Sequence, residues 1–189
     1  MEQYFDENAS QDLLHIQSEI LRYRSTFLMN DRERARFLGL PAGCRIRENA
    51  KILAPQNFRC GENIWIGEGA ILDAQGGLEI GEFSQIGLYV MIWSHTTHKQ
   101  ALASETGVSK EKIIYKPTKI GKNCFIAGHS VISAGVTIGD NVIIAPMSFV
   151  DRDLPDGAVY SQNKQMRALE DRVASLEAEI QALRQARGE

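Results

Sequence analysis

The stretch "IGKNCFIAGHSVISAGVTIGDNVIIAPMSFVDRDLPDG", residues 120–157, repeats a unit of six residues. Each unit opens with an aliphatic residue, and a small residue or Asp follows it. An aliphatic residue at every sixth position fits neither the 3.6-residue period of a helix nor the alternation of an amphipathic strand. It is typical of a coil in which short strands alternate with turns and the aliphatic side chains stack inside.

The repeat extends through the centre of the chain. Twelve units can be written in register from Cys60, with Leu78 and Glu79 inserted, and eleven of the twelve begin with Ile, Leu or Val. Eleven have Gly, Ala, Ser or Asp in second place, which suits a crowded corner; the exception is Trp93. Three units make one turn of a triangular prism, so we expect Ile120 to lie over Ile138 and Gly128 over Pro146.

This pattern resembles the hexapeptide-repeat acyltransferases over about residues 48–160. The resemblance implies a mainly β fold, a left-handed parallel β-helix, and a homotrimer with active sites between subunits. We therefore expect an N-terminal helical region at residues 1–47, the β-helix at 48–160 and a C-terminal helix at 161–189.

Composition excludes several function classes. The 189-residue chain has a net charge of -3 and no cluster of basic residues with interleaved aromatics, so we expect no nucleic-acid partner. No apolar run is long enough for a membrane span, and the acidic opening is unlike a signal peptide, so we expect a cytoplasmic protein. The three cysteines are widely spaced, which favours reduced thiols over a disulfide framework.

The repeat stops between His98 and Lys119, and two histidines stand at the interruption. His95 lies in the last unit before it and His98 opens it. A loop that leaves a rigid prism is a place where a cleft forms, and imidazole is a common general base. The arrangement resembles the galactoside, maltose and xenobiotic acetyltransferase branch and its relatives acting on bacterial surface sugars, where such a histidine deprotonates the acceptor hydroxyl. Both His95 and His98 are candidates for this role.

Acyl transfer from a thioester needs a base, a donor for the developing oxyanion and a groove for the carrier. The chain has no GxSxG motif, so we expect direct transfer without a covalent enzyme intermediate. The resemblance implies acetyl-CoA as donor and no metal. It implies these coenzyme contacts: Ala127, Gly128, Ser133, Ala145, Pro146 and Ser148. The closing run of the repeat departs from the family pattern, so the candidate cations for the coenzyme's phosphates are taken from this chain alone: Arg152, Lys164 or Arg167. Pro146 departs from the family pattern because proline has no N–H to donate.

Two residues are candidates on the acceptor side. Asp73 takes the second place of a unit one coil before the histidines, where it either binds a sugar hydroxyl or orients an imidazole. Trp93 stands beside His95 and either stacks on a sugar or packs against the loop.

Other readings remain open from the sequence. N-acetylation of an amino sugar, free or nucleotide-linked, is one alternative, and a non-catalytic oligomeric scaffold is another. A zinc site made by His95, His98 and His129 is less favoured, because the resemblance to zinc enzymes of this fold requires histidines where Gly128 and Ser133 stand.

Both ends of the chain predict helices. Residues 10–23 carry apolar side chains at helical spacing after Ser10, as expected for a cap on the open end of a solenoid. Residues 166–187 carry a heptad pattern, which predicts an interaction helix. Its β-branched a positions and leucine d positions favour two strands, whereas the family resemblance implies three.

Overall fold

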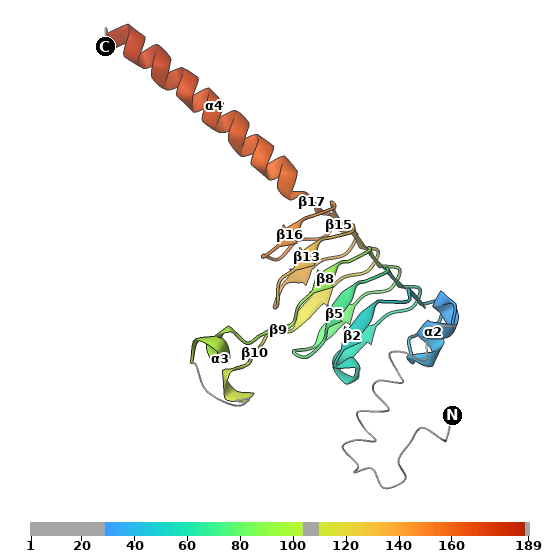
Figure 1. Cartoon of the computed structure of the whole chain (residues 1–189). Coiled ribbons are helices and arrows are strands. Elements are labelled where there is room, and N and C mark those ends of the chain that lie inside the picture. The colour runs from blue at the N-terminus through green and yellow to red at the C-terminus, as the bar shows by residue number, and fades with distance from the viewer. Residues whose placement is uncertain (1–28, 104–109, 188–189) are drawn as a thin grey trace, which may run out of the picture.

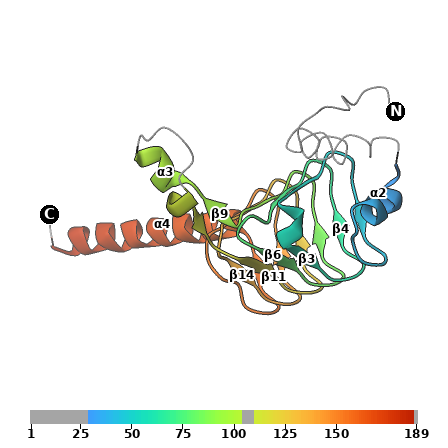
Figure 2. The ribbon, with the colours of Figure 1, turned by 90° about the horizontal axis from the view of Figure 1, so that it is seen from below.

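The structure, a computed structural model, describes residues 29–103 and 110–187, and it is a parallel β-helix with three sheets around one core (Figures 1 and 2). Face A contains β1 (Arg45–Ile46), β4 (Trp65–Ile66), β7 (Gln85–Ile86), β12 (Phe125–Ile126), β15 (Ile143–Ile144) and β17 (Val159–Tyr160). Face B contains β2 (Lys51–Leu53), β5 (Ile71–Asp73), β8 (Met91–Ile92), β13 (Val131–Ile132) and β16 (Phe149–Val150). Face C contains β3 (Phe58–Cys60), β6 (Leu78–Ile80), β11 (Thr118–Ile120) and β14 (Thr137–Ile138).

The register confirms the prediction from the six-residue period. Ile120 pairs in parallel with Ile138, and Met147 N donates to Gly128 O at 3.1 Å, so the corner of residue 146 stacks on that of residue 128. The strands β1 and β2 precede the first unit visible in the sequence pattern, which opens at Cys60, the last residue of β3. There one turn takes 20 residues, as Ile46 pairs with Ile66.

The aliphatic residue of each unit fills the core. The largest fully buried side chains are Ile46, Ile64, Ile66, Leu72, Leu78, Ile80, Ile86, Ile92, Ile126, Ile132, Ile138 and Ile144. Their stacking along the inside of the prism removes apolar surface from water in every coil, which is the main stabilising contribution in a solenoid.

The corners require small residues, as the sequence predicted. A Cβ on Gly87 would lie 2.7 Å from Gly128 N, and one on Gly121 would lie 2.5 Å from the carbonyl carbon of Gly139. Successive coils therefore approach too closely for a side chain at these places.

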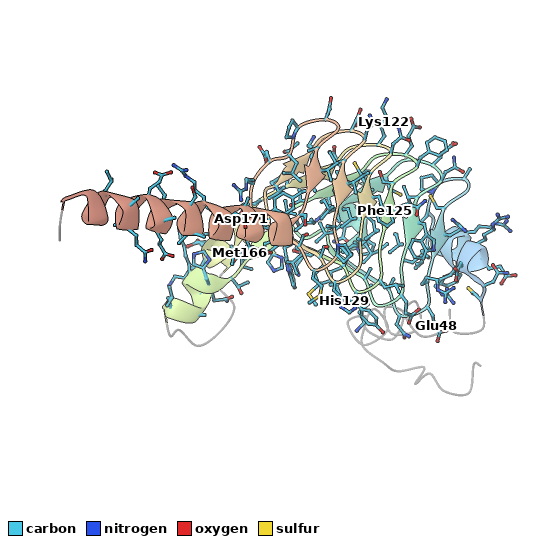
Figure 3. All side chains as sticks on the ribbon, turned by 90° about the horizontal axis from the view of Figure 1, so that it is seen from above. Glu48, Lys122, Phe125, His129, Met166 and Asp171 are labelled. Atoms are coloured by element: carbon cyan, nitrogen blue, oxygen red, sulfur yellow. The ribbon has the colours of Figure 1, made fainter. Side chains whose placement is uncertain are left out.

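The three outer surfaces differ in character. Face A exposes Phe125, Ile143 and Val159, and face B exposes Met91 and Phe149. Face C instead presents a charged row in which Lys119 Nζ lies 3.0 Å from Glu79 Oε2. Figure 3 shows Phe125 on face A, between the corner that holds His129 and the corner that holds Lys122. Apolar surface is thus concentrated on two of the three faces.

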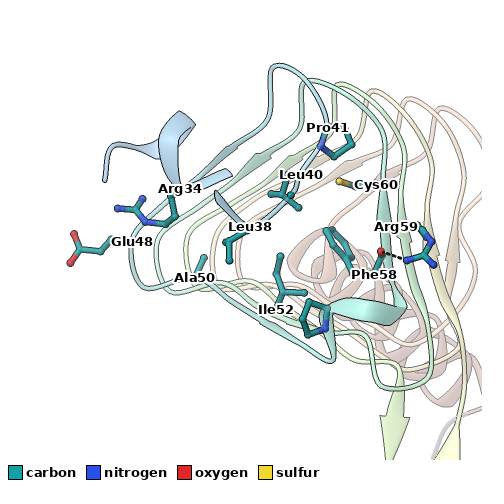
Figure 4. A pocket seen from close by; sticks show the side chains of 12 residues that line it. Arg34, Leu38, Leu40, Pro41, Glu48, Ala50, Ile52, Phe58, Arg59 and Cys60 are labelled. Carbon is teal, nitrogen blue, oxygen red and sulfur yellow. Dashed lines mark hydrogen bonds between the residues drawn. The ribbon is translucent and has the colours of Figure 1, made fainter. Parts of the chain in front are cut away.

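The N-terminal end of the prism contains a cavity of about 260 Å³ beside α2 (Asp31–Phe37) (Figure 4). Its lining includes Leu38, Ile52 and Phe58. The helix predicted for residues 10–23 lies outside the described residues. The helix α2 begins with a capping box in which Asn30 Oδ1 accepts from Glu33 N and Glu33 Oε2 accepts from Asn30 N.

The C-terminal helix α4 (Gln162–Arg187) leaves the last coil and extends away from the prism (Figures 1 and 2). A helix at the C-terminus agrees with the sequence prediction. Within residues 29–103 and 110–187, no helix combines the length and apolarity needed to cross a membrane.

Candidate active site

The interruption of the repeat forms a projection from the corner between faces B and C (Figure 1). The strands β9 (His95–Thr96) and β10 (Ile114–Tyr115) pair antiparallel, with His95 opposite Tyr115. Between them lie α3 (His98–Leu102) and the 3-10 turn η4 (Lys110–Lys112). The projection therefore begins at His95, earlier than the predicted loop start at residue 98, and its base is a two-stranded ribbon.

His95 forms the central contact of this corner. Its Nδ1 lies 2.5 Å from Oδ2 of Asp73, which ends β5 in the coil before. The Asp73 side chain is fully buried and the His95 side chain is 14% exposed. A buried carboxylate with an imidazole at this distance is a charge-assisted pair, which fixes the ring more firmly than a neutral hydrogen bond would.

Both carboxylate oxygens of Asp73 accept hydrogen bonds. Gln75 N donates to Oδ1 at 3.0 Å, and Ser94 N donates to Oδ2 at 2.9 Å. The Ser94 hydroxyl donates to Oδ2 at 3.3 Å and accepts from Gly76 N at 2.8 Å. Asp73 thus faces His95 and the backbone of the corner, and its burial leaves no surface for the direct sugar contact considered from the sequence.

The contact with Asp73 assigns the tautomer of His95. An ionised carboxylate only accepts hydrogen bonds, so Nδ1 carries the proton. In the neutral ring Nε2 then keeps its lone pair, which makes it the basic nitrogen. A neutral imidazole fixed in this way has the arrangement that a general base requires.

His98 has different surroundings. It is the first residue of α3, is exposed, and its Nδ1 lies 3.0 Å from Thr96 Oγ1. A threonine hydroxyl neither stabilises an imidazolium as a carboxylate does nor fixes the tautomer, because it can donate or accept. The geometry therefore separates the two histidines, which the sequence could not, and favours His95.

A cleft opens beside His95 and is lined by Trp93, Thr96, Thr97, Lys116, Ser133 and Ala134. Three hydrogen bonds shape it. The Thr118 hydroxyl donates to Trp93 O at 2.6 Å and accepts from Gly135 N at 3.0 Å. Lys116 N donates to Ser94 O at 2.8 Å, which ties the returning end of the projection to the outgoing one. Trp93 thus lies in the cleft wall beside His95.

The predicted coenzyme residues divide between two corners. Ser133 lines the histidine cleft. Ala127, Gly128, Ala145, Pro146 and Ser148 lie at the corner between faces A and B. Gly128 and Ser133 are five residues apart along an extended path of about 16 Å at most. One prism alone does not bring the six residues together.

Several of these residues already donate hydrogen bonds to other residues of the β-helix. Ala127 N and Ala145 N donate to Ile144 O and Tyr160 O, both at 2.9 Å. The Ser148 hydroxyl donates to Ala145 O at 2.7 Å. In the described part of the chain, Gly128 N and the Ser133 hydroxyl have no such partner, so these two donors are free for a ligand.

The three predicted phosphate cations are at the C-terminal end of the prism. Arg152 is exposed and its Nε lies 3.5 Å from Asp151 Oδ1. Lys164 and Arg167 belong to α4, and their side chains lie outside the described residues.

The third histidine considered for zinc lies away from the other two. His129 stands at the corner between faces A and B, where its ring stacks on Tyr89 with centroids 5.2 Å apart. Within the residues that the structure describes, no group of three or more His, Cys, Asp or Glu side chains is arranged to hold a metal.

The thiols are poorly suited to nucleophilic catalysis. All three cysteines are free. Burial raises the pKa of the Cys60 thiol to about 12, with nearby Cys44 adding to the shift, and burial also raises the pKa of Cys124. A neutral, partly buried thiol at physiological pH is a weak nucleophile.

Sequence reasoning did not identify Ser94, Tyr115, Lys116 and Thr118 as parts of this corner. Ser94 carried a signal, since it follows Trp93 and precedes His95 within one repeat unit. The other three follow the interruption, and only the return path of the chain places them beside His95.

Comparison with known proteins finds a family model that matches part of this chain. Residues 117–152 match the family described as bacterial transferase hexapeptide (six repeats). The coils of residues 117–152 therefore carry the six-residue repeat that this family model describes. This match covers the coils on the C-terminal side of the projection, which carry Gly128, Ser133 and Pro146.

Two curated relatives extend the hexapeptide-repeat match. The putative colanic acid biosynthesis acetyltransferase WcaF of Escherichia coli K12 is 30% identical over 120 residues, covering 62% of this chain and 61% of WcaF. The galactoside O-acetyltransferase of the same organism is 34% identical over 121 residues, covering 60% of this chain and 57% of the relative. The chain thus spans about three fifths of the length of each.

A solved structure shares the β-helix fold. A hexapeptide-repeat-containing acetyltransferase of Vibrio cholerae O1 biovar eltor, complexed with acetyl coenzyme A, has a TM-score of 0.50 and 23% identity. The alignment covers 82% of this chain and 86% of that one.

Proposed function

We propose that this protein is an O-acetyltransferase that moves an acetyl group from acetyl-CoA to a sugar or glycan hydroxyl, with His95 as general base. The observation that carries the proposal is the 2.5 Å contact between His95 Nδ1 and the buried Asp73 carboxylate. It leaves Nε2 of the imidazole as a basic nitrogen next to an open cleft. The names of the two curated acetyltransferase relatives support the reaction class.

The chemistry proceeds as one direct transfer. His95 Nε2 takes the proton of the acceptor hydroxyl as its oxygen attacks the thioester carbonyl. The carbon–sulfur bond breaks, the electron pair leaves with sulfur, and the proton from the imidazolium neutralises the thiolate. Atoms and charge balance without an acyl-enzyme, which agrees with the raised pKa values of Cys60 and Cys124.

Asp73 acts as a positioning residue in this scheme. It holds the ring through Nδ1–H and stabilises the imidazolium that forms when Nε2 is protonated. Its other bonds, to Gln75 N and Ser94 N, keep the carboxylate from turning away. The negative charge of Asp73 is therefore already in place beside the His95 ring, on which positive charge develops during transfer.

Ser133 is the candidate donor to the carbonyl oxygen of the thioester. It lines the same cleft as His95, and its N–H is already used, because Ser133 N donates to Val150 O at 2.9 Å. The hydroxyl is the group that remains to interact with a ligand. Trp93 is the candidate contact for the acceptor sugar, because its indole offers an apolar ring face.

The coenzyme site is proposed to be completed by a second copy of the chain in a homotrimer. The separation of Ser133 from the Gly128 corner supports this, since a neighbouring prism can bring its own Gly128 corner to the cleft. The apolar surfaces support it too: faces A and B differ in sequence, so face A of one copy can meet face B of the next. The smallest closed ring made by such a contact is a trimer.

The experiment that tests the function is acetyl-CoA turnover, followed by thiol release, against a panel of sugars and amino sugars with the products identified by mass. The proposal expects turnover that depends on a hydroxyl acceptor, with one added acetyl group that mild base removes as an ester. Turnover with amino sugars alone, giving a base-stable amide, would assign N-acetylation instead. No turnover and no coenzyme binding with any acceptor would favour the scaffold.

A further inference from the structure

The helix α4 carries an apolar stripe that no other part of the chain covers within residues 29–103 and 110–187. Six apolar side chains lie at a 3-4 spacing and are 40% to 63% exposed: Met166, Leu169, Val173, Leu176, Ile180 and Leu183. The remaining described positions of the helix are polar or small and also exposed. A helix of this composition gains little stability alone, so the stripe indicates a partner helix.

The start of α4 is fixed to the prism. Phe149 N donates to Gln162 Oε1 at 3.0 Å, and the Tyr160 hydroxyl donates to Phe149 O at 2.8 Å. From there α4 continues away from the C-terminal coil in both ribbon views (Figures 1 and 2). Copies whose prisms stand side by side in the same direction would therefore present their α4 helices in parallel.

The charges beside the stripe favour the same orientation. With Val173 at an a position, Arg172 takes g and Glu177 takes e of the next heptad. Residues at g and at the following e, five positions on, are neighbours across a parallel coil, so opposite charges would meet. Glu179 and Arg184 have the same spacing in the sequence with the signs exchanged.

An antiparallel pair fits the charges less well. Its core layers would set Val173 against Leu176 of the other helix, which keeps the apolar contacts. The flanking e positions would then bring Glu170 and Glu177 together, two like charges in the sequence, while the g positions would set Arg172 against Glu179. The unfavourable and favourable pairs offset each other, whereas both charged pairs of the parallel arrangement are opposite in sign. Charge thus distinguishes two arrangements that the apolar stripe alone allows.

We propose that α4 is an assembly helix that joins copies of this chain through a parallel, in-register, three-stranded coiled coil at the C-terminal end of the prisms. The number of strands rests on the trimer of the proposed function, but acetyl transfer does not enter the readout below. Val and Ile at a with Leu at d favour two strands in free peptides. In a ring of three prisms, the three α4 helices begin side by side at the same end. The ring of prisms therefore sets the number of strands in the coiled coil.

The test uses the full chain with one added cysteine. Val173→Cys places a thiol at an a position, where parallel, in-register helices bring identical residues together. Ala178→Cys is the matched control, because position f faces away from the coil. The unmodified chain, oxidised in the same way, accounts for Cys44, Cys60 and Cys124.

The proposal expects a rapid interchain disulfide in Val173→Cys that stops at about two of every three chains, since one chain of each trimer lacks a partner. Ala178→Cys should cross-link at least about tenfold more slowly, because its thiols point apart. Equal rates in the two variants would overturn the coiled coil. Complete pairing of Val173→Cys would overturn the three strands, and a disulfide that forms only when Val173→Cys is combined with Leu176→Cys would overturn the parallel orientation.

Charge exchange tests the register independently. In the Val173→Cys background, Arg172→Glu and Glu177→Arg should each slow cross-linking about fivefold, because each sets like charges together. The double variant restores an opposite pair and should return the rate to within about twofold. Single variants with unchanged rates, or a double variant slower than either, would contradict the parallel pairing of these two positions.

Discussion

Replacing Asp73 by Asn tests how the corner controls His95. The side chain keeps its volume in a site with no exposed surface, but it loses its charge. Both carboxylate oxygens accept from N–H donors: Oδ1 from Gln75, and Oδ2 from Ser94 and His95. Whichever way the amide turns, its NH₂ group faces a donor, so at least one hydrogen bond of the network is lost.

The two orientations of the amide have different effects on the imidazole. If the amide oxygen faces His95, the ring keeps its tautomer but the imidazolium loses a charged partner. If the NH₂ group faces His95, Nδ1 must accept, Nε2 carries the proton, and the base is lost. A hydrogen bond to a charged group contributes about 1.5–3 kcal/mol. That range corresponds to a decrease in kcat of about 10- to 150-fold.

The assay is thiol release from acetyl-CoA at saturating acceptor, with kcat and KM determined separately. We expect the KM for acetyl-CoA to stay within about twofold, because in the proposed mechanism Asp73 acts on the base and not on the carrier. Glu79→Gln is the matched control, since it removes a carboxylate of face C that is paired with Lys119 in solvent. The reasoning is refuted if Asp73→Asn retains kcat within about threefold of the unmodified protein while Glu79→Gln is equally active.

Three further predictions concern stability and reactivity. Gly76→Ala places a Cβ in contact with Ser94 O and 3.0 Å from Lys116 N, so it should destabilise the fold by about 1–3 kcal/mol, and an unchanged Tm in thermal unfolding would contradict the packing. Thr118→Val removes the hydroxyl that joins Trp93 O to Gly135 N, and should cost about 1–3 kcal/mol in denaturant unfolding; a cost under about 0.5 kcal/mol would show that the bridge is dispensable. The Cys60 thiol, with its pKa raised from 9.0 to about 12, should stay neutral at pH 8 and alkylate at least about tenfold more slowly than in the unfolded chain. Because the folded pKa is the higher one, its contribution to stability is complete below pH 9 and declines between pH 9 and about 12, and rapid alkylation of Cys60 at pH 8 in the folded protein would refute this.

The six-residue period was sufficient to predict the coil, because each unit buries the same aliphatic position and pairs with the unit three places away. Ile120 pairs with Ile138 for this reason. The β-helix expected at residues 48–160 includes β2 and β3 but leaves out β1, and the repeat itself was recognised only from Cys60 onward. Before Cys60 the 3-10 turn η3 (Pro55–Asn57) interrupts the coil, and the strands lack the small second residues. Local pattern thus predicts a solenoid where the pattern is regular and misses it where a corner varies.

The fold supplies a reason to prefer His95 over His98 that the sequence did not contain. The two residues differ by three positions in the sequence, but β5 ends beside only one of them. Asp73 was noted as a candidate that either orients an imidazole or contacts a sugar, and the 2.5 Å distance to His95 favours the first role. Contacts such as Lys116 N to Ser94 O depend on where the projection returns, which the intervening residues do not encode in a periodic way.

The measurement that tests the central claim most directly is a comparison of His95→Ala with His98→Ala in acetyl-CoA turnover with a hydroxyl acceptor. The account predicts that His95→Ala lowers kcat by at least about 100-fold, the contribution of a positioned general base, while His98→Ala stays within about threefold. Equal Tm values for the two variants would establish that both are folded. If His98→Ala loses activity and His95→Ala keeps it, the Asp73–His95 pair is structural and the assignment of the base is wrong.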